Sequence, residues 1–493
     1  MAEDPVMLLE KIREYGGKRV TGGLDDDTIR KFCERDEKLP LAIKRAVSEH
    51  KLLRGEFEDE LSMQEEELCR LVQSDFVNFY KSETRNPFVA ISAAGPWIVT
   101  SHGAVIHDSA GYGMLGMGHS SPKLLESMAK PWVMANVMTP QFSQKRFTNR
   151  LKKEIGHTRG ECPYSRFICM NSGSESVSVA SRISDINALL ETSEGGSHEG
   201  KIIKQLAVEE GFHGRTYRAA AVSDSCMAAY KEHLASFQKE QTLVTVPLND
   251  CEALKEAFAR AEKENVFFEA MYIEPVMGEG EPGKAVSREF YDLARKLTLE
   301  SGSFLIVDSV QAALRVQGCL SIVDYPGFED CEAPDCETYS KALNAGQYPL
   351  SVLALNKKFA DIYTPGVYGN TMTTNPRALE VGCAVLDDIT DRLRVNIREK
   401  GKELYKKFEK LAGEFPEAII SVTGTGLIVS AELNPDRYQV VGEKGFEYYL
   451  RTHGIGMIHG GHNGIRFTPH FKITSEEIEL IISTVRDGLK ELG

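Results

Sequence analysis

Between about residues 160 and 355, short apolar runs alternate with longer amphipathic stretches. The runs are rich in Val, Ile, Leu, Phe and Met, which is typical of buried strands. We expect strands at 167–170, 205–208, 243–246, 270–273, 304–307 and 350–355. Helical stretches separate them, as at 250–263 and 287–301. This alternation predicts an α/β fold with a mostly parallel, doubly wound sheet.

The segments on either side of this region have other patterns. Apolar runs at 96–100 and 104–108 are split by Ser101-His102-Gly103, which predicts a hairpin. A long helix is expected from Asn375-Pro376 to about residue 415, and mixed strands and helices follow it. The C-terminal region therefore predicts a smaller α+β lobe.

The N-terminal 80 residues are rich in charge and have helical character. Residues 25–28 can cap one helix, and apolar residues recur at helical spacing over 56–80. This segment is either an arm that packs on the main body or on a partner subunit, or a solvated extension without a catalytic role. The solvated extension is the favoured interpretation.

These patterns divide the chain into four expected parts. They are a helical N-terminal extension, the N-terminal part of a small domain, a large domain and the C-terminal part of the small domain. Their expected boundaries are 1–85, 86–125, 126–375 and 376–493.

Composition limits the classes of partner. Of 493 residues, 42% are hydrophobic and 26% are charged, as in an ordinary soluble protein. The net charge of −14 argues against nucleic acid or an anionic membrane as the main partner. No apolar run approaches the length of a membrane span, and the acidic start does not resemble a signal peptide. The ten scattered cysteines lack the spacing of a metal site and indicate reduced thiols in the cytoplasm.

The strand expected at 304–307 ends in Asp308, and Lys341 follows a short polar and aromatic run. An acid and a lysine on separate strand ends are what pyridoxal phosphate chemistry requires. The lysine forms a Schiff base with the cofactor, and the acid pairs with the protonated ring nitrogen. Taken singly, Asp308 is more often a turn or cap residue and Lys341 a surface residue.

Three further motifs follow expected strands. Gly173 and Ser174 open a helix and predict an anion site suited to phosphate, or else a plain helix cap. Phe212 or His213 is able to stack on a flat ring and Arg215 to bind a carboxylate, unless they form an ordinary turn. Glu279 lies between two glycines and is a candidate site carboxylate, or else a solvated loop acid.

The order and content of these motifs resemble a class III (omega) aminotransferase of pyridoxal-phosphate fold type I. The similarity is to the branch that contains 4-aminobutyrate, ornithine and lysine 6-aminotransferases, and it runs from about residue 95 to 469. It implies a large domain with a mostly parallel sheet and a smaller α+β domain formed by the chain ends. It also implies a homodimer with shared active sites.

The resemblance implies roles for the cofactor residues. Lys341 is the Schiff-base lysine and proton shuttle, and Asp308 pairs with the pyridine nitrogen. The other implied cofactor residues are Gly173 and Ser174 on the phosphate, Val310 and Phe212 on the two ring faces, Gln311 on the ring hydroxyl, and Thr371, which reaches a phosphate across the dimer interface.

For the substrate, the resemblance implies that Arg215 binds a carboxylate. Arg466 binds a second carboxylate or pairs with Glu279, and such a pair would be a removable positive site. The chain departs from the usual family pattern in several places. Ser309 replaces the Glu of Asp-Glu-Val-Gln, and Thr373-Thr374 replaces Gly-Gly. These changes leave the cofactor residues in place and alter their surroundings.

The expected activity is therefore a ping-pong transamination that moves an amino group, expected to be an omega-amino group, from an amino acid or amine to 2-oxoglutarate. No metal is expected. Two alternatives stay open. One is an aminomutase or racemase on the same fold, which would need no separate acceptor. The other is a regulatory relative that binds ligands without turnover.

Overall fold

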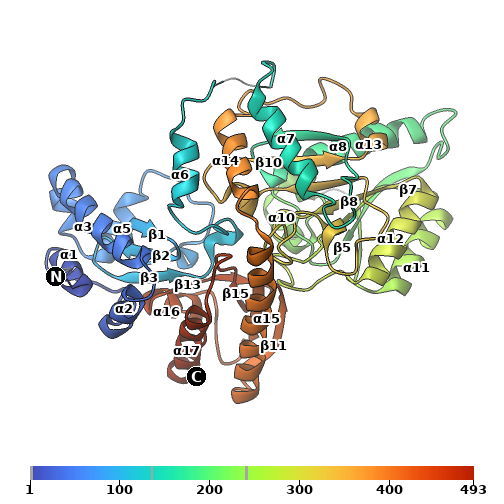
Figure 1. Cartoon of the computed structure of the whole chain (residues 1–493). Helices are drawn as coiled ribbons and strands as arrows, with labels where there is room; N and C mark the ends of the chain where they lie inside the picture. Colours follow the sequence, from blue (N-terminus) through green and yellow to red (C-terminus); the bar gives the residue numbers. More distant parts are fainter. Residues whose placement is uncertain (1–3, 135–136, 239–241, 443) are drawn as a thin grey trace. The chain divides into compact units, whose positions relative to one another are not determined.

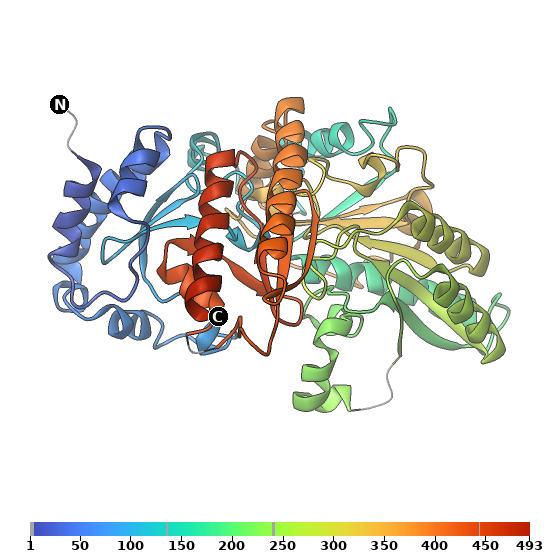
Figure 2. The same cartoon turned by 90° about the horizontal axis from the view of Figure 1, so that it is seen from below.

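The computed structural model describes residues 4–134, 137–238, 242–442 and 444–493. The chain forms two compact units (Figures 1 and 2). Unit 1 comprises Met1–Leu125 and Glu399–Gly493, and unit 2 comprises Glu126–Arg398. None of the helices in the described ranges has the length and apolar character that a membrane crossing needs.

Unit 2 is built on a seven-stranded sheet of order β4-β10-β9-β8-β7-β5-β6. The strands are β4 (Arg166–Met170), β5 (Ile202–Val208), β6 (Leu243–Val246), β7 (Val266–Ile273), β8 (Phe304–Asp308), β9 (Cys336–Tyr339) and β10 (Ser351–Leu355). Pairing is parallel from β6 through β5, β7 and β8 to β9, and β10 is antiparallel to both of its neighbours. The predicted α/β class and mostly parallel sheet are confirmed.

The predicted strands match the structure because the central strands are apolar and buried throughout. Every residue of β7 and β8 is buried, as expected where both faces of a parallel sheet are covered. The strand β9 had not been predicted as a strand, because Glu337 and Thr338 make it half polar. Both residues are nevertheless buried.

Helices cover this sheet. Those of unit 2 are α7 (Phe142–Glu154), α8 (Gly173–Thr192), α9 (Tyr217–Ala220), α10 (Met227–His233), α11 (Cys251–Lys263), α12 (Arg288–Ser301), α13 (Lys357–Ile362) and α14 (Pro376–Leu386). Apolar residues of α8 and α13 share one core cluster with β4, β5, β7, β8, β9 and β10. The neighbours α11 and α12 pack on β7, as Figure 1 shows.

Two of the predicted helices are confirmed. The predicted helices at 250–263 and 287–301 are α11 and α12, capped by Asp250 and Ser287. The prediction of a single long helix after Asn375-Pro376 is wrong. The chain instead forms α14 and then α15 (Asp391–Glu414). The Thr390 hydroxyl accepts the Leu393 N–H at 3.3 Å, so a new N-cap starts the second helix.

Unit 1 contains two four-stranded sheets, of order β1-β2-β3-β13 and β11-β12-β15-β14. Their strands are β1 (Ala90–Ala94), β2 (Trp97–Thr100), β3 (Val105–Asp108), β11 (Ile419–Thr425), β12 (Ile428–Leu433), β13 (Ile455–Gly456), β14 (Ile458–Gly460) and β15 (Gly464–Phe467). The antiparallel pair β2–β3 confirms the predicted hairpin.

The helices of unit 1 are mostly N-terminal. They are α1 (Pro5–Arg13), α2 (Asp26–Cys33), α3 (Lys38–Glu56), α4 (Glu58–Leu61), α5 (Glu65–Val72), α16 (Phe446–Thr452) and α17 (Ser475–Leu492). Two further helices, α6 (Pro122–Ala129) and α15, each begin in one unit and end in the other. A continuous helical segment over 56–80 is not observed, because the chain breaks at Phe57 and again after Leu61.

The N-terminal helices are part of a hydrophobic core, so the favoured interpretation of a solvated extension is wrong. Apolar residues of α1, α2 and α3 form one buried cluster with the hairpin residues Trp97, Val99 and Val105. The Trp97 indole N–H also donates to Asp36 at 2.7 Å. Charged residues lie between these apolar ones along the chain, so the segment resembled a solvated extension.

Candidate active site

Asp308 is the last residue of β8 and is 4% exposed. Its Oδ2 lies 3.0 Å from His213 Nδ1, and its Oδ1 accepts the Val310 N–H at 3.1 Å. In the parallel register Asp308 is opposite Thr338 of β9. The carboxylate is therefore fixed at the carboxyl edge of the sheet, where α/β proteins bind ligands.

His213 is the main partner of this acid. Burial alone would lower the pKa of His213, but the hydrogen bond and the charge of Asp308 raise that pKa overall. Its other ring nitrogen, Nε2, is buried and has no hydrogen-bond partner among the described residues. The sequence had offered His213 only as a residue able to stack on a ring. Its pairing with the acid depends on the fold.

Glu274 is a second buried acid that sequence reasoning did not single out. It follows β7 and accepts N–H groups from Phe212 and Gly278, each at 3.0 Å. Burial raises the pKa of Glu274 to about 7. The position of an acid directly after a buried strand was a signal that could have identified it. Its two contacts hold the loops that carry Phe212 and Glu279.

Lys341 lies two residues after β9 and opens the short 3-10 helix Lys341–Asn344. Its backbone has φ 44°, which is uncommon for a residue with a side chain. Such conformations are found more often at functional sites than elsewhere. Asp308 and Lys341 thus follow the neighbouring parallel strands β8 and β9.

The N-terminus of α8 faces the loop after β5. The Ser174 hydroxyl accepts the Arg215 N–H at 2.9 Å, so its own hydrogen remains available for donation. The Thr216 hydroxyl donates to the Ser174 carbonyl at 2.9 Å. Gly214 permits this approach, since a Cβ there would lie 2.1 Å from Ser174 Oγ. The free N–H groups of a first helical turn and this hydroxyl suit an anion.

Other predicted cofactor residues surround the same strand ends. Val310 packs on Gly173, where an added Cβ would lie 2.7 Å from Val310 Cγ2. The Arg215 guanidinium lies over the Phe212 ring, with Cζ 5.4 Å from the ring centre. Phe212 is half-buried and Arg215 is exposed.

Gln311 and Glu279 form a direct pair. Gln311 Nε2 donates to Glu279 Oε1 at 3.0 Å. Gly278 brings them together, because a Cβ there would lie 2.3 Å from Gln311 Cγ. The glycine beside Glu279 therefore serves a close approach.

Thr371 lies in an exposed loop that is tied to the start of α8. Glu175, in the first turn of α8, accepts hydrogen bonds from Tyr368 at 3.2 Å and from Asn370 at 3.0 Å. Thr371 and Met372 follow this anchor and are both exposed. Arg466 differs from the other predicted residues, because it lies buried on β15 in unit 1.

The residues present fit pyridoxal phosphate. A buried acid paired with an imidazole suits a protonated ring nitrogen, and the start of α8 suits a phosphate. Gly173 lies close to Val310, so the backbone at the start of α8 is next to an apolar side chain. The backbone suits the phosphate and the side chain suits the ring of the same ligand. Lys341 has a primary amine of the kind that a Schiff base with this cofactor requires.

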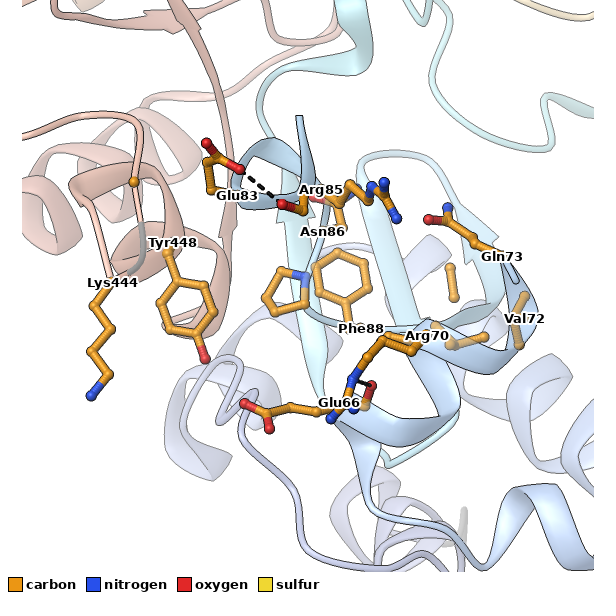
Figure 3. A pocket seen from close by; sticks show the side chains of 16 residues that line it. Glu66, Arg70, Val72, Gln73, Glu83, Arg85, Asn86, Phe88, Lys444 and Tyr448 are labelled. Carbon is orange, nitrogen blue, oxygen red and sulfur yellow. Dashed lines mark hydrogen bonds between the residues drawn. The ribbon is translucent and has the colours of Figure 1, made fainter. Parts of the chain in front are cut away.

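A cavity in unit 1 is a separate feature with a volume of about 790 Å³ (Figure 3). It is lined by α5 residues such as Glu66 and Arg70, by Arg85 and by Tyr448. Figure 3 shows acidic and basic side chains mixed around it. No single charge therefore selects a ligand, and none of the predicted site residues lines it.

Comparison with known proteins identifies the family. The model of the family described as aminotransferase class-III matches residues 79–489. Ornithine aminotransferase from Staphylococcus carnosus is 28% identical over 408 residues, which are 81% of this chain and 93% of that protein. Acetylornithine aminotransferase from Clostridium acetobutylicum is 30% identical over 329 residues, 66% of this chain and 76% of that protein.

Solved structures show the same fold. The ornithine aminotransferase from Toxoplasma gondii, whose structure has partial occupancy of pyridoxal phosphate at its active site, matches with a TM-score of 0.74 at 22% identity. The match covers 89% of this chain and 97% of that chain. The chain belongs to the class-III aminotransferase family and is a pyridoxal-phosphate-dependent aminotransferase.

Proposed function

We propose that this enzyme transfers the omega-amino group of an ornithine-like donor to 2-oxoglutarate. The observation that carries the proposal is the placement of Asp308 and Lys341 after adjacent parallel strands. Val310, two residues after Asp308, packs on Gly173 at the start of α8. The names of the relatives, ornithine and acetylornithine aminotransferases, support a donor with a terminal amine and an α-carboxylate.

The cofactor would supply an electron sink that stabilises negative charge at the substrate carbon. Lys341 would hold the cofactor and carry a proton between substrate and cofactor through Nζ. Asp308 would keep the ring nitrogen protonated, and His213 would hold the Asp308 carboxylate in place. Gly173 and Ser174 would hold the phosphate through N–H groups and a hydroxyl. Val310 and Phe212 would pack on the ring faces, and Gln311 would approach the ring hydroxyl.

Substrate recognition requires carboxylate-binding groups. Arg215 is exposed beside the site loop, and its planar guanidinium is suited to forked binding of a carboxylate. We assign it to one carboxylate of the donor or acceptor. The assignment of Arg466 to a second carboxylate, or to a pair with Glu279, stays a prediction.

The acceptor is tested by steady-state kinetics. Ornithine and 2-oxoglutarate would be varied together, and glutamate formation measured. The proposal expects parallel double-reciprocal lines, as in a ping-pong mechanism, and no turnover without an oxo-acid. Turnover of the amino acid in the absence of any oxo-acid would favour an aminomutase or racemase. Pyruvate, tested in place of 2-oxoglutarate at the same concentration, shows which of these two oxo-acids is the acceptor.

We further propose a homodimer with shared sites. Unit 2 exposes large apolar side chains around α7 and the Thr371 loop, namely Val133, Met134, Val137, Met138, Phe142 and Met372. Exposed apolar patches of this kind mark interaction surfaces. Thr371 would reach the cofactor phosphate of the partner.

Dilution tests the shared site. Cofactor retention and mass, measured by light scattering, should fall together as the dimer separates. Thr371→Ala should raise the cofactor Kd by about threefold to tenfold, the effect of one neutral hydrogen bond. A monomer that retains cofactor as tightly as the dimer would contradict sharing.

The ten cysteines are free, which supports a cytoplasmic location.

A further inference from the structure

Glu337 is a completely buried carboxylate on β9 that no proposed catalytic step uses. Five groups donate hydrogen bonds to it: the hydroxyls of Ser309, Ser321, Tyr164 and Tyr339, and the Ile322 N–H. A carboxylate has about four lone-pair positions, so these donors occupy both oxygens fully. All five donor residues are themselves buried.

The two oxygens have different partners. Oε1 accepts from Ser309 Oγ at 2.5 Å and from the Ile322 N–H at 3.0 Å. Oε2 accepts from the Tyr164 and Tyr339 hydroxyls, each at 2.9 Å, and also from the Ser321 hydroxyl. Burial raises the pKa of Glu337, and the hydrogen bonds oppose that shift. Each donor loses a partner if the carboxylate is removed, and unpaired buried donors are costly.

One of these hydrogen bonds, that from Ser309, leads directly to the active site. Ser309 is the residue after Asp308, and its N–H donates to the Thr338 carbonyl at 3.1 Å. Glu337 lies on the same strand that leads to Lys341. The Glu337 carboxylate therefore connects Ser309, the residue after β8, to β9.

We propose that Glu337 is a positioning residue, which through the Ser309 hydroxyl fixes the peptide carrying Asp308 relative to the strand that leads to Lys341. The inference rests on the proposed roles of Asp308 and Lys341. It predicts that loss of the link displaces the acid, loosens the cofactor and slows the chemical step. A purely structural role would affect stability alone.

Ser309→Ala and Tyr164→Phe form a matched pair for the test. Each removes one hydroxyl from Glu337, but only Ser309 is adjacent to a predicted site residue. The measurements are the cofactor Kd, the pH midpoint of the cofactor absorption band, and kcat and KM. Ser309→Ala should raise the cofactor Kd about threefold to tenfold, move the pH midpoint and lower kcat with little change in the donor KM.

Tyr164→Phe should lower the free energy of unfolding about as much as Ser309→Ala does. It should leave the cofactor Kd and the pH midpoint at their wild-type values. Glu337→Gln should reproduce the Ser309→Ala changes if it folds. The proposal is overturned if Ser309→Ala binds cofactor with the wild-type Kd and pH midpoint, or if Tyr164→Phe changes both equally. Wild-type cofactor binding and turnover test the proposed function separately, so failure of the two ideas can be distinguished.

Discussion

The Asp308 carboxylate and the His213 imidazole form a buried pair, with Oδ2 3.0 Å from Nδ1. Both side chains are at most 5% exposed. The acid raises the pKa of His213 against the effect of burial. A histidine with a raised pKa stabilises the fold fully below its unfolded pKa, and that contribution is lost as the pH rises through the folded pKa. The contribution of this pair to stability is therefore largest in acid and declines as the pH rises through the folded pKa of His213.

His213→Gln should lower kcat by roughly 10–100-fold, because a hydrogen bond to a charged group contributes about 1.5–3 kcal/mol. The loss should be accompanied by a change in the alkaline limb of the kcat profile. The matched control is His198→Gln, which replaces a half-buried imidazole bonded to the Ser301 carbonyl at 2.8 Å. An unchanged kcat in His213→Gln would contradict a role for this imidazole.

Ser174→Ala should weaken cofactor binding by removing one phosphate hydroxyl. A neutral hydrogen bond contributes about 0.5–1.5 kcal/mol, so the Kd should rise roughly twofold to tenfold in a fluorescence titration. Ser178→Ala is the control, since its hydroxyl is on the same helix and pairs with Thr216 at 2.7 Å. Equal effects of the two substitutions would argue against a phosphate contact at Ser174.

Gly173→Ala should weaken both the fold and cofactor binding. The added Cβ would lie 2.7 Å from Val310 Cγ2, and overpacking of this kind costs about 1–3 kcal/mol. Gly413→Ala in α15 is the control, because nothing lies within 4 Å of its Cβ. It should stabilise the protein slightly through helix propensity. Thermal unfolding is measured for both variants. Equal unfolding midpoints for Gly173→Ala and Gly413→Ala would contradict the close packing at Gly173.

Glu477 predicts acid sensitivity of unit 1. Its Oε1 accepts hydrogen bonds from His470 at 3.0 Å and His107 at 3.1 Å. Although burial raises it, the two histidines hold the pKa of Glu477 well below its ordinary value. Its stabilising contribution is therefore present above the unfolded pKa of about 4.3 and is lost as the pH falls through the folded value.

Glu477→Gln should lower the free energy of unfolding by about 1–3 kcal/mol at pH 7, and the difference from wild type should shrink in acid. Glu479→Gln is the control, since it removes an exposed carboxylate from the same helix. Urea unfolding at several pH values measures the difference. A deficit that does not depend on pH would show that the charge of Glu477 is unimportant.

The sequence predicted the parts of this site that depend on strand ends. An apolar run followed by an acid located Asp308, and a glycine and a serine before a helix located the start of α8. The contacts between these parts could not be predicted. His213 meets Asp308 across 95 residues of chain, and only the order of β5, β7 and β8 in the sheet brings them together.

Polar and charged composition concealed other features. Buried Glu337 and Thr338 made β9 resemble a loop, since a strand signal depends on apolar residues. Charge-rich α1, α2 and α3 resembled a solvated arm, although Leu9, Ile29 and Ile43 are completely buried or nearly so. The break between α14 and α15 depends on one threonine cap, which a helical periodicity cannot reveal.

The most direct test of the account is the covalent attachment of the cofactor. The purified enzyme would be loaded with pyridoxal phosphate, reduced with borohydride, digested and analysed by mass spectrometry. The account predicts a cofactor adduct on the peptide that contains Lys341, and none in Lys341→Ala, which should remain folded and lose turnover. An adduct on another lysine, or substantial transamination by Lys341→Ala, would contradict the assignment.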